Sequence, residues 1–199
     1  MKSKETMWLL VRVENNSNFL SLPINLPISR KGLNTLLSDS KISLSDCCFY
    51  YVFGKWGEPI DAYPLSNSDV NELNWLAGVL GTLSEENFQK WNIVCGEGLW
   101  GMFWSQFRGM ISVALNIDCY RYLPEIKTSA DYGKWLVENN IVSFDLHINS
   151  SPDYAFIGEY YSHREEGVFS RYGYTACISE ETNTDSQKGV PKEYILLGN

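Results

Sequence analysis

The sequence has few of the residues that bind metals or act as catalytic nucleophiles and bases. It contains two histidines, His147 and His163, and neither stands in a recognisable motif with a cysteine or a serine. Asp145 and His147 form a D-x-H pair, but the sequence offers no identifiable third and fourth metal ligand. The five cysteines are irregularly spaced and include no C-x-x-C motif, which argues against a zinc site and a disulfide framework. We expect no catalytic residues, no metal and no cofactor, and thiols typical of a reducing cytoplasm.

Long apolar runs and basic stripes are also missing. No window of about 18 apolar residues is present, so we expect no membrane span. The apolar run near the N-terminus is ended by Arg12 and Glu14 too soon for a signal peptide. The net charge is −8 and no basic stripe is visible, which argues against a general nucleic-acid binder. We therefore expect a cytoplasmic protein that does not bind duplex DNA directly.

The composition is that of a globular protein, with 44% hydrophobic and 14% aromatic residues in a chain of 199. Its charge is unevenly placed: residues 1–41 carry +3, residues 42–108 carry −5 and residues 109–199 carry −6. Between positions 56 and 107, a single lysine, Lys90, stands against seven carboxylates. These are Glu58, Asp61, Asp69, Glu72, Glu85, Glu86 and Glu97. A purely solvated surface usually mixes charges of both signs, so the set is interpreted either as a partner-binding surface or as ordinary exposed carboxylates.

The first third predicts a small α+β unit. Residues 7–14 alternate as a strand that is central or partly covered, and residues 20–28 hold two prolines, which suits an edge strand or an extended connection. Ser29 is an expected cap for a short helix through Leu37. The aromatic and branched run at 47–54 predicts another strand.

Two short amphipathic helices are predicted between Ser68 and Val94. Ser68 is the expected cap of the first helix and Ser84 that of the second, with Gly81 between them. The outer face of the first helix carries Asn71, Asn74 and Gly78. The residues that follow, 95–109, are rich in glycine and large aromatics, and we expect these aromatics in the core or in a partner-facing patch.

The last part of the chain predicts a further α+β unit. Residues 111–117 predict a strand, and Thr128 opens a helix with Asp131 in a capping box. A turn or short helix over 151–157 is followed by a strand over 169–178 and a polar, mobile tail over 179–189. The expected fold class is α+β, with small subdomains in tandem. Their predicted limits are an N-terminal α+β subdomain at 1–64, a central helical subdomain at 65–108, and a C-terminal α+β subdomain with its tail at 109–199.

Three stretches in this order make the chain resemble the ArdA family of antirestriction proteins. The first runs from FYYVFGKWGEPIDAYPL into DVNELNWLAGVLGTLSEENFQKW, the second is DYGKWLVENN, and the third is SPDYAFIGEYYSHREEGVFSRYGYT. The resemblance covers roughly residues 45–178, and the first 44 residues share only the arrangement. It implies an elongated chain of small α+β subdomains that imitates DNA and occupies the DNA-binding channel of a type I restriction-modification enzyme. Duplex DNA carries one charge about every 1.7 Å of axis, a spacing that surface carboxylates can copy.

The resemblance also implies a homodimer that forms through the last third of the chain. The region in question contains Asp153, Tyr154, Phe156, Gly158, Glu159 and Tyr160. Tyrosines are favoured at interfaces, although core packing explains Tyr154, Tyr160 and Tyr161 equally well. The expected function is thus a non-enzymatic inhibitor whose partner is a host restriction-modification enzyme. The alternative is a protein-binding module of phage or mobile-element origin that inhibits a different host defence protein through an aromatic surface.

Overall fold

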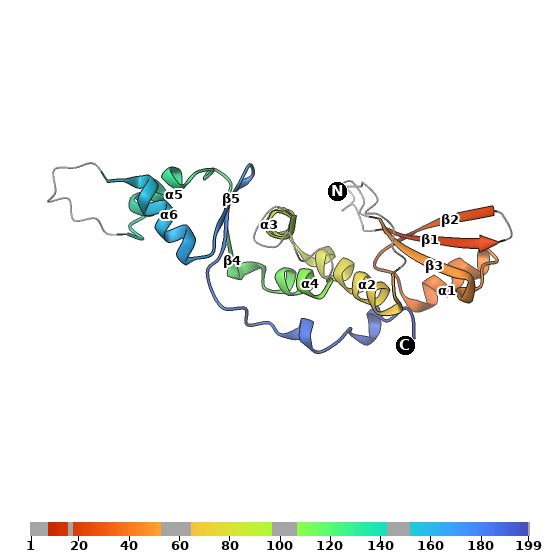
Figure 1. The fold of residues 1–199 in the computed structure, drawn as a ribbon. Helices are drawn as coiled ribbons and strands as arrows, with labels where there is room; N and C mark the ends of the chain where they lie inside the picture. The colour runs from red at the N-terminus through yellow and green to blue at the C-terminus, as the bar shows by residue number, and fades with distance from the viewer. Residues whose placement is uncertain (1–7, 16–17, 53–64, 97–106, 143–151, 199) are drawn as a thin grey trace. The chain divides into compact units, whose positions relative to one another are not determined.

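The computed structural model describes residues 8–15, 18–52, 65–96, 107–142 and 152–198 (Figure 1). It shows an α+β protein with two three-stranded antiparallel sheets. The strands are β1 (Trp8–Asn15), β2 (Asn18–Asn25), β3 (Cys47–Val52), β4 (Tyr120–Leu123), β5 (Val168–Ser170) and β6 (Gly173–Cys177). The α-helices are α1 (Arg30–Asp39), α2 (Asn67–Thr82), α3 (Glu85–Gly96), α4 (Phe107–Leu115), α5 (Ser129–Glu138) and α6 (Tyr154–Arg164). Short 3-10 helices are η1 (Leu44–Asp46), η3 (Ile117–Cys119), η4 (Asp185–Gln187) and η5 (Lys192–Tyr194).

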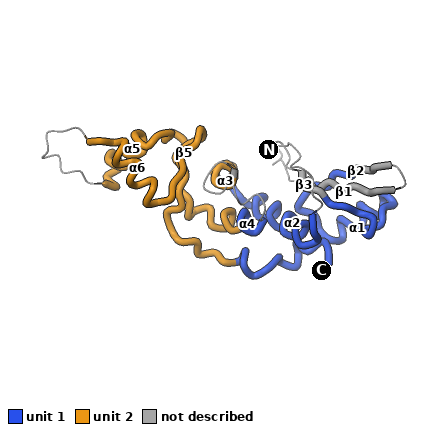
Figure 2. The backbone as a smooth tube through the Cα atoms, viewed as in Figure 1, with its two compact units in different colours: residues 1–83, 107–111, 185–199 blue, residues 84–106, 112–184 orange. Residues whose placement is uncertain are grey.

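The chain divides into two compact units (Figure 2). Unit 1 contains residues 1–83, 107–111 and 185–199, and unit 2 contains residues 84–106 and 112–184. Unit 1 is therefore assembled from segments that are far apart in the sequence, whereas only residues 107–111 interrupt unit 2. The division into three subdomains stays a prediction. Among the described residues, no helix has the length and apolar character needed to cross a bilayer.

The sheet of unit 1 has the strand order β2-β1-β3. The prediction that the first strand is central is confirmed, because β1 pairs with β2 on one side and β3 on the other. Pro23 lies in the edge strand β2, where a residue without an N–H is tolerated. Ser29 caps α1 as expected, with its hydroxyl accepting from the Gly32 amide.

The helix α2 begins with a capping box two residues before the expected cap. Ser66, rather than Ser68, accepts from the amide of Asp69, and the Asp69 carboxylate accepts in return from the Ser66 amide at 3.0 Å. The helix is buried over most of its length, from Val70 to Leu80. Asn71, Asn74 and Gly78, all expected on an outer face, are buried as well, so that prediction is wrong.

The core of unit 2 lies between its sheet, of order β4-β6-β5, and two helices that pack against each other, α5 and α6 (Figure 1). Thr128 and Asp131 form the predicted capping box of α5, and Asn139 ends the helix. The buried members of this core are Ile126, Tyr132, Leu136, Ile157, Tyr174 and Ala176.

Three predicted elements of the C-terminal half differ in the structure. The strand prediction for 111–117 is wrong, because α4 continues to Leu115; Phe107, Met110, Ile111 and Ala114 are buried at helical spacing. The expected break before Gly158 is absent, and α6 runs through that glycine to Arg164. The single strand expected over 169–178 is instead a hairpin, in which Ser170 pairs with Gly173. Gly173 has a φ of +142°, which favours glycine and lets the chain reverse there.

Residues 179–189, predicted as a mobile polar tail, make several hydrogen bonds to the rest of the protein. In unit 2, the Asn116 side chain bonds with both the N–H and the C=O of Asn183, at 2.8 and 3.0 Å. The Glu181 carboxylate accepts from Ser112 at 2.9 Å and from Tyr120 at 2.6 Å. Polar composition predicted mobility here, but these polar groups are matched by polar side chains on the elements beneath them.

Candidate functional site

The net charge of the protein belongs to one of its two units. Unit 1 contains ten acidic and ten basic residues, so its formal charge is zero. Unit 2 contains fourteen acidic and six basic residues, which accounts for the whole −8. Arg108 neutralises the single excess carboxylate of residues 1–83, and the two lysines of residues 185–199 are balanced by Asp185 and Glu193.

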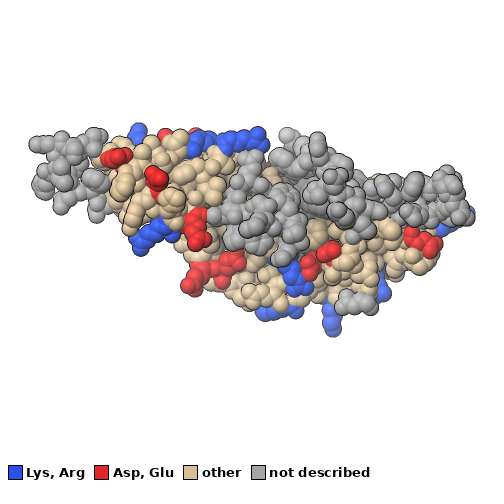
Figure 3. All heavy atoms as spheres, in the orientation of Figure 1, with Lys and Arg blue, Asp and Glu red and all other residues tan. Residues whose placement is uncertain are grey.

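Carboxylates on the surface of unit 2 outnumber its exposed cations. Those exposed among its described residues are Glu85, Glu86, Asp118, Glu125, Asp131, Glu138, Asp153, Glu159, Glu166, Glu180 and Glu181. The exposed cations of the same described part are Lys127, Lys134, Arg164 and Arg171. Figure 3 shows carboxylates at several places on the face of this unit that is in view, with some lysines and arginines near them. We name these eleven exposed carboxylates the acidic surface of unit 2.

The acidic residues singled out from positions 56–107 fall into three groups. Glu85 and Glu86 lie in the first turn of α3 and belong to the acidic surface of unit 2. Asp69 and Glu72 belong to unit 1, where each has an internal partner: Asp69 completes the cap of α2, and Glu72 accepts from Nε of Arg108. Their charges therefore stabilise unit 1 locally. Glu58, Asp61 and Glu97 lie outside the described residues.

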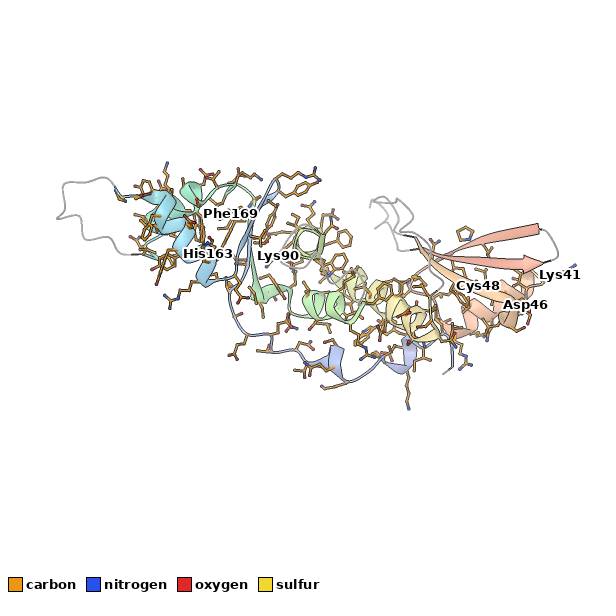
Figure 4. The ribbon with its side chains drawn as sticks, viewed as in Figure 1. Lys41, Asp46, Cys48, Lys90, His163 and Phe169 are labelled. Atoms are coloured by element: carbon orange, nitrogen blue, oxygen red, sulfur yellow. The ribbon has the colours of Figure 1, made fainter. Side chains whose placement is uncertain are left out.

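Lys90, the single lysine of that stretch, is half-buried in α3 (Figure 4). Burial lowers its pKa, and this effect outweighs the opposite influence of nearby Asp118 and Glu86. The cation is thus partly withdrawn from solvent, whereas Asp118 and Glu86 are exposed.

Two residues of the family-like segment 153–160 build the helix α6 itself. Asp153 is its N-cap, and its Oδ1 accepts from the Phe156 amide at 3.0 Å. Gly158 is buried where α6 crosses α5, and a Cβ there would overlap the backbone carbonyl of Ser129. The D-Y-x-x-x-G pattern therefore contains a cap and a helix-crossing residue, five positions apart.

Two aromatic residues of the same helix point to solvent. Phe156 and Tyr160 are four residues apart and 67% and 53% exposed. The ring of Tyr160 meets that of Tyr161 edge-on, with centroids 5.3 Å apart, and Tyr161 is only half-buried. Glu159, on the same helix, lies 3.9 Å from exposed His163 (Figure 4). We call Phe156 and Tyr160 the aromatic face of α6; Tyr154, by contrast, is half-buried.

A charged cluster inside unit 2 was not predicted from the sequence. The Glu165 carboxylate accepts from Tyr132 at 2.6 Å, from Tyr174 at 3.0 Å and from Arg121 at 3.1 Å. The side chains of Arg121 and Glu165 are 20% and 21% exposed. These four residues come from β4, α5, β6 and the end of α6, so one carboxylate links every major element of the core. The four residues span 54 positions and form no motif, so the sequence contains no signal for the cluster.

The cluster perturbs the acidity of its tyrosines. Burial, with the hydrogen bond to Glu165, raises the pKa of Tyr132 to about 12. Burial and the neighbouring Tyr132 likewise raise the pKa of Tyr174. The two rings stack with centroids 4.1 Å apart, and Phe169 lies 4.9 Å from Tyr174 (Figure 4). With both phenols and Nη1 of Arg121 bonded to one carboxylate and the rings packed, this arrangement is typical of a stabilising core network.

No group of three or more potential metal ligands occurs within the described residues. Asp145 and His147, the D-x-H pair, lie outside them. A scan against protein-family models finds no match for this chain, and a search of curated proteins finds none either.

Proposed function

We propose that this chain is a non-enzymatic antirestriction protein whose acidic surface imitates DNA and occupies the DNA-binding channel of a type I restriction-modification enzyme. The observation that carries the proposal is the concentration of the whole net charge in unit 2, with eleven exposed carboxylates on its described residues. The three family-like stretches support the same interpretation. The residues that we expect to face the partner are those of the acidic surface of unit 2, including Glu85 and Glu86.

Electrostatic attraction gives this surface a physical mechanism. A channel that binds DNA is lined with lysine and arginine, and it attracts any surface that carries negative charge at comparable density. Glu85, Glu86 and their neighbours are available for that contact because they are exposed. Asp69 and Glu72 contribute less, because both are half-buried and Glu72 is paired with Arg108.

The proposed assembly is a homodimer that forms through the aromatic face of α6. Phe156 and Tyr160 offer apolar area next to a polar rim that includes Asp153 and Glu159. Across a two-fold axis each carboxylate meets its own copy, so the acidic residues must stay at the rim or pair with a cation such as Arg164. Replacing Phe156 and Tyr160 by glutamate is therefore expected to give a folded monomer, which light scattering distinguishes from a dimer.

Inhibition of DNA cleavage tests the proposed function. A purified type I restriction enzyme is incubated with the protein and then with unmodified DNA at increasing concentrations. A DNA mimic gives competitive inhibition that excess DNA overcomes. Cleavage that is unaffected at micromolar protein, or inhibited to the same degree at every DNA concentration, contradicts the proposal.

A second candidate function is favoured by the exposure of the aromatic face of α6. We propose it as a protein-binding module that inhibits a different defence protein through Phe156 and Tyr160, with its charge incidental. The two candidates make opposite predictions for variants. Loss of these aromatics abolishes binding by such a module, whereas neutralising the carboxylates of unit 2 leaves it intact.

A further inference from the structure

One face of α2 carries side-chain amides instead of charges. Asn67, Asn71, Asn74 and Gly78 are spaced at i, i+4, i+7 and i+11, which places them along one side of the helix. We call these four residues the asparagine face. Residues 194–198 lie along it, and Figure 1 shows the last part of the chain beside α2. All of these residues belong to unit 1.

Asn71 holds two consecutive residues of this segment by their backbone. Its Oδ1 accepts from the amides of Leu196 and Leu197, at 2.8 and 2.9 Å, and its Nδ2 donates to the carbonyl of Leu197 at 2.9 Å. The two amide donors identify the oxygen end of the side chain. Asn71 is 5% exposed, so these bonds are shielded from water. One side chain thereby satisfies three backbone groups, whatever side chains those residues carry.

The neighbouring asparagines extend this backbone recognition in both directions. Nδ2 of Asn74 donates to the carbonyl of Tyr194 at 3.1 Å and also to that of Ile28 at 3.0 Å. Nδ2 of Asn67 donates to the carbonyl of Gly198 at 3.0 Å. The asparagine face therefore follows the segment over five residues.

Side chains of the segment add selectivity for sequence. Leu196 and Leu197 are 1% and 2% exposed, so both fill apolar sites of unit 1. The ring of Tyr194 lies against Gly78, where any Cβ would overlap it. An aromatic residue followed two positions later by a pair of leucines is thus the pattern that fits.

We propose that the asparagine face is a binding site for an extended peptide, that the segment 194–198 is its releasable ligand, and that the same segment of a second copy of this chain can replace it. The segment is suited to release because Leu196 and Leu197 belong to no helix or strand, and their amides bond to the single side chain of Asn71. Gly189, with a φ of +100° and open space around its Cα, supplies a hinge before it. Release then breaks no sheet and no helix ladder. The second copy is the natural alternative source, since it carries the identical ligand.

Hydrogen exchange on the full chain tests whether the ligand is releasable. We expect the amides of Leu196 and Leu197 to exchange at least tenfold faster than those of Leu73 and Leu76 in α2, because the segment opens while the helix stays folded. Asn71→Ala should accelerate the two segment amides further, and the matched change Asn67→Ala, at an exposed position, should affect them less. If segment and helix amides exchange at one common rate in the wild type, the segment is an integral part of the core and the proposal fails.

Binding in trans tests the site itself. The probe is a fluorescent peptide with the sequence of residues 190–199, and the receptor is the full chain with Leu196→Ala and Leu197→Ala, which weaken its own ligand. We expect this variant to bind the probe at least tenfold more tightly than wild type does, and to ignore a probe in which both leucines are alanine. Absence of binding by a variant with a wild-type circular dichroism spectrum overturns the proposal. If the variant does not fold, the exchange measurement on the wild type decides alone.

Discussion

Gly133 of α5 and Gly158 of α6 face each other where the two helices cross. A Cβ built on either glycine would lie 2.8 Å from the backbone nitrogen of the other, and would also overlap a neighbouring carbonyl. Neither contact can be relieved by moving a flexible side chain. The two helices therefore pack at a distance that only glycine permits, and this crossing fixes α6 on the core of unit 2.

This crossing predicts a large effect of a single methyl group. Gly158→Ala or Gly133→Ala should lower the free energy of unfolding by about 3 kcal/mol or more, because backbone must move to make room. Gly81→Ala is the matched control, since nothing lies within 4 Å of its added Cβ in helix α2. It should be neutral or stabilising by up to about 1 kcal/mol. Urea unfolding measures all three, and equal effects at Gly158 and Gly81 would contradict the close crossing.

The carboxylate of Glu165 is expected to hold unit 2 together. Glu165→Ala leaves Arg121, Tyr132 and Tyr174 without their common partner, at a cost of about 2 to 3 kcal/mol in unfolding free energy. Glu138→Ala is a suitable control, because its contact with Lys134, at 3.7 Å, is exposed on both sides. Its expected effect is below about 0.5 kcal/mol. A Glu165 variant as stable as the Glu138 variant would show that the cluster does not stabilise the unit.

The sequence predicted the elements whose signals are local. Ser29 and the pair Thr128 and Asp131 cap helices because capping needs only residues three positions apart. The sequence did not predict the roles of residues whose partners are far away along the chain. The carboxylate of Glu165 gains its role from Arg121, 44 positions away, and Asn71 gains its role from Leu196 and Leu197, 125 and 126 positions away.

The sequence predicted that the protein has an acidic surface, but it did not predict which residues form that surface. Sequence windows put seven carboxylates near the middle of the chain, yet Asp69 and Glu72 are held inside unit 1. The net charge falls on unit 2 because residues 1–83 are nearly neutral, Arg108 joins them, and residues 185–199 carry equal numbers of acidic and basic residues. The limits of the two units, which decide this division, cannot be predicted from the charge pattern.

The free energy of unfolding of unit 2 should fall at alkaline pH, already below the pH at which its buried tyrosines ionise in the folded state. The pKa of Tyr132 rises from 10.0 to about 12 on folding, and burial raises that of Cys95 from 9.0 to about 12. Their stabilising contributions are complete below the unfolded pKa values and are lost as pH rises through the folded ones. The free energy of unfolding should therefore fall from about pH 9 to pH 12. Urea unfolding at successive pH values tests this, and Tyr132→Phe should reduce the slope above pH 10; a slope that is unchanged in this variant would contradict the assignment.

Neutralising carboxylates of unit 2 should weaken target binding, whereas neutralising carboxylates of unit 1 should not. Glu85→Gln with Glu86→Gln removes two exposed charges from the acidic surface and should reduce affinity for the restriction enzyme by about tenfold, or about 1.4 kcal/mol. The matched control is Asp39→Asn with Glu193→Gln, which removes two exposed charges from unit 1. It should change affinity less than twofold. Equal losses in both double variants would mean that net charge, rather than the surface of unit 2, governs binding.

The most direct test of the proposed mimicry is the salt dependence of binding to a type I restriction enzyme. The dissociation constant is measured by titration at ionic strengths from about 0.05 to 0.5 M, where the Debye length falls from about 14 to 4 Å. Because screened charge supplies the attraction, affinity should fall steeply and continuously with salt, and duplex DNA should compete for the same site throughout. An affinity that stays constant over this range, or binding that excess DNA does not displace, would contradict DNA mimicry by the acidic surface of unit 2.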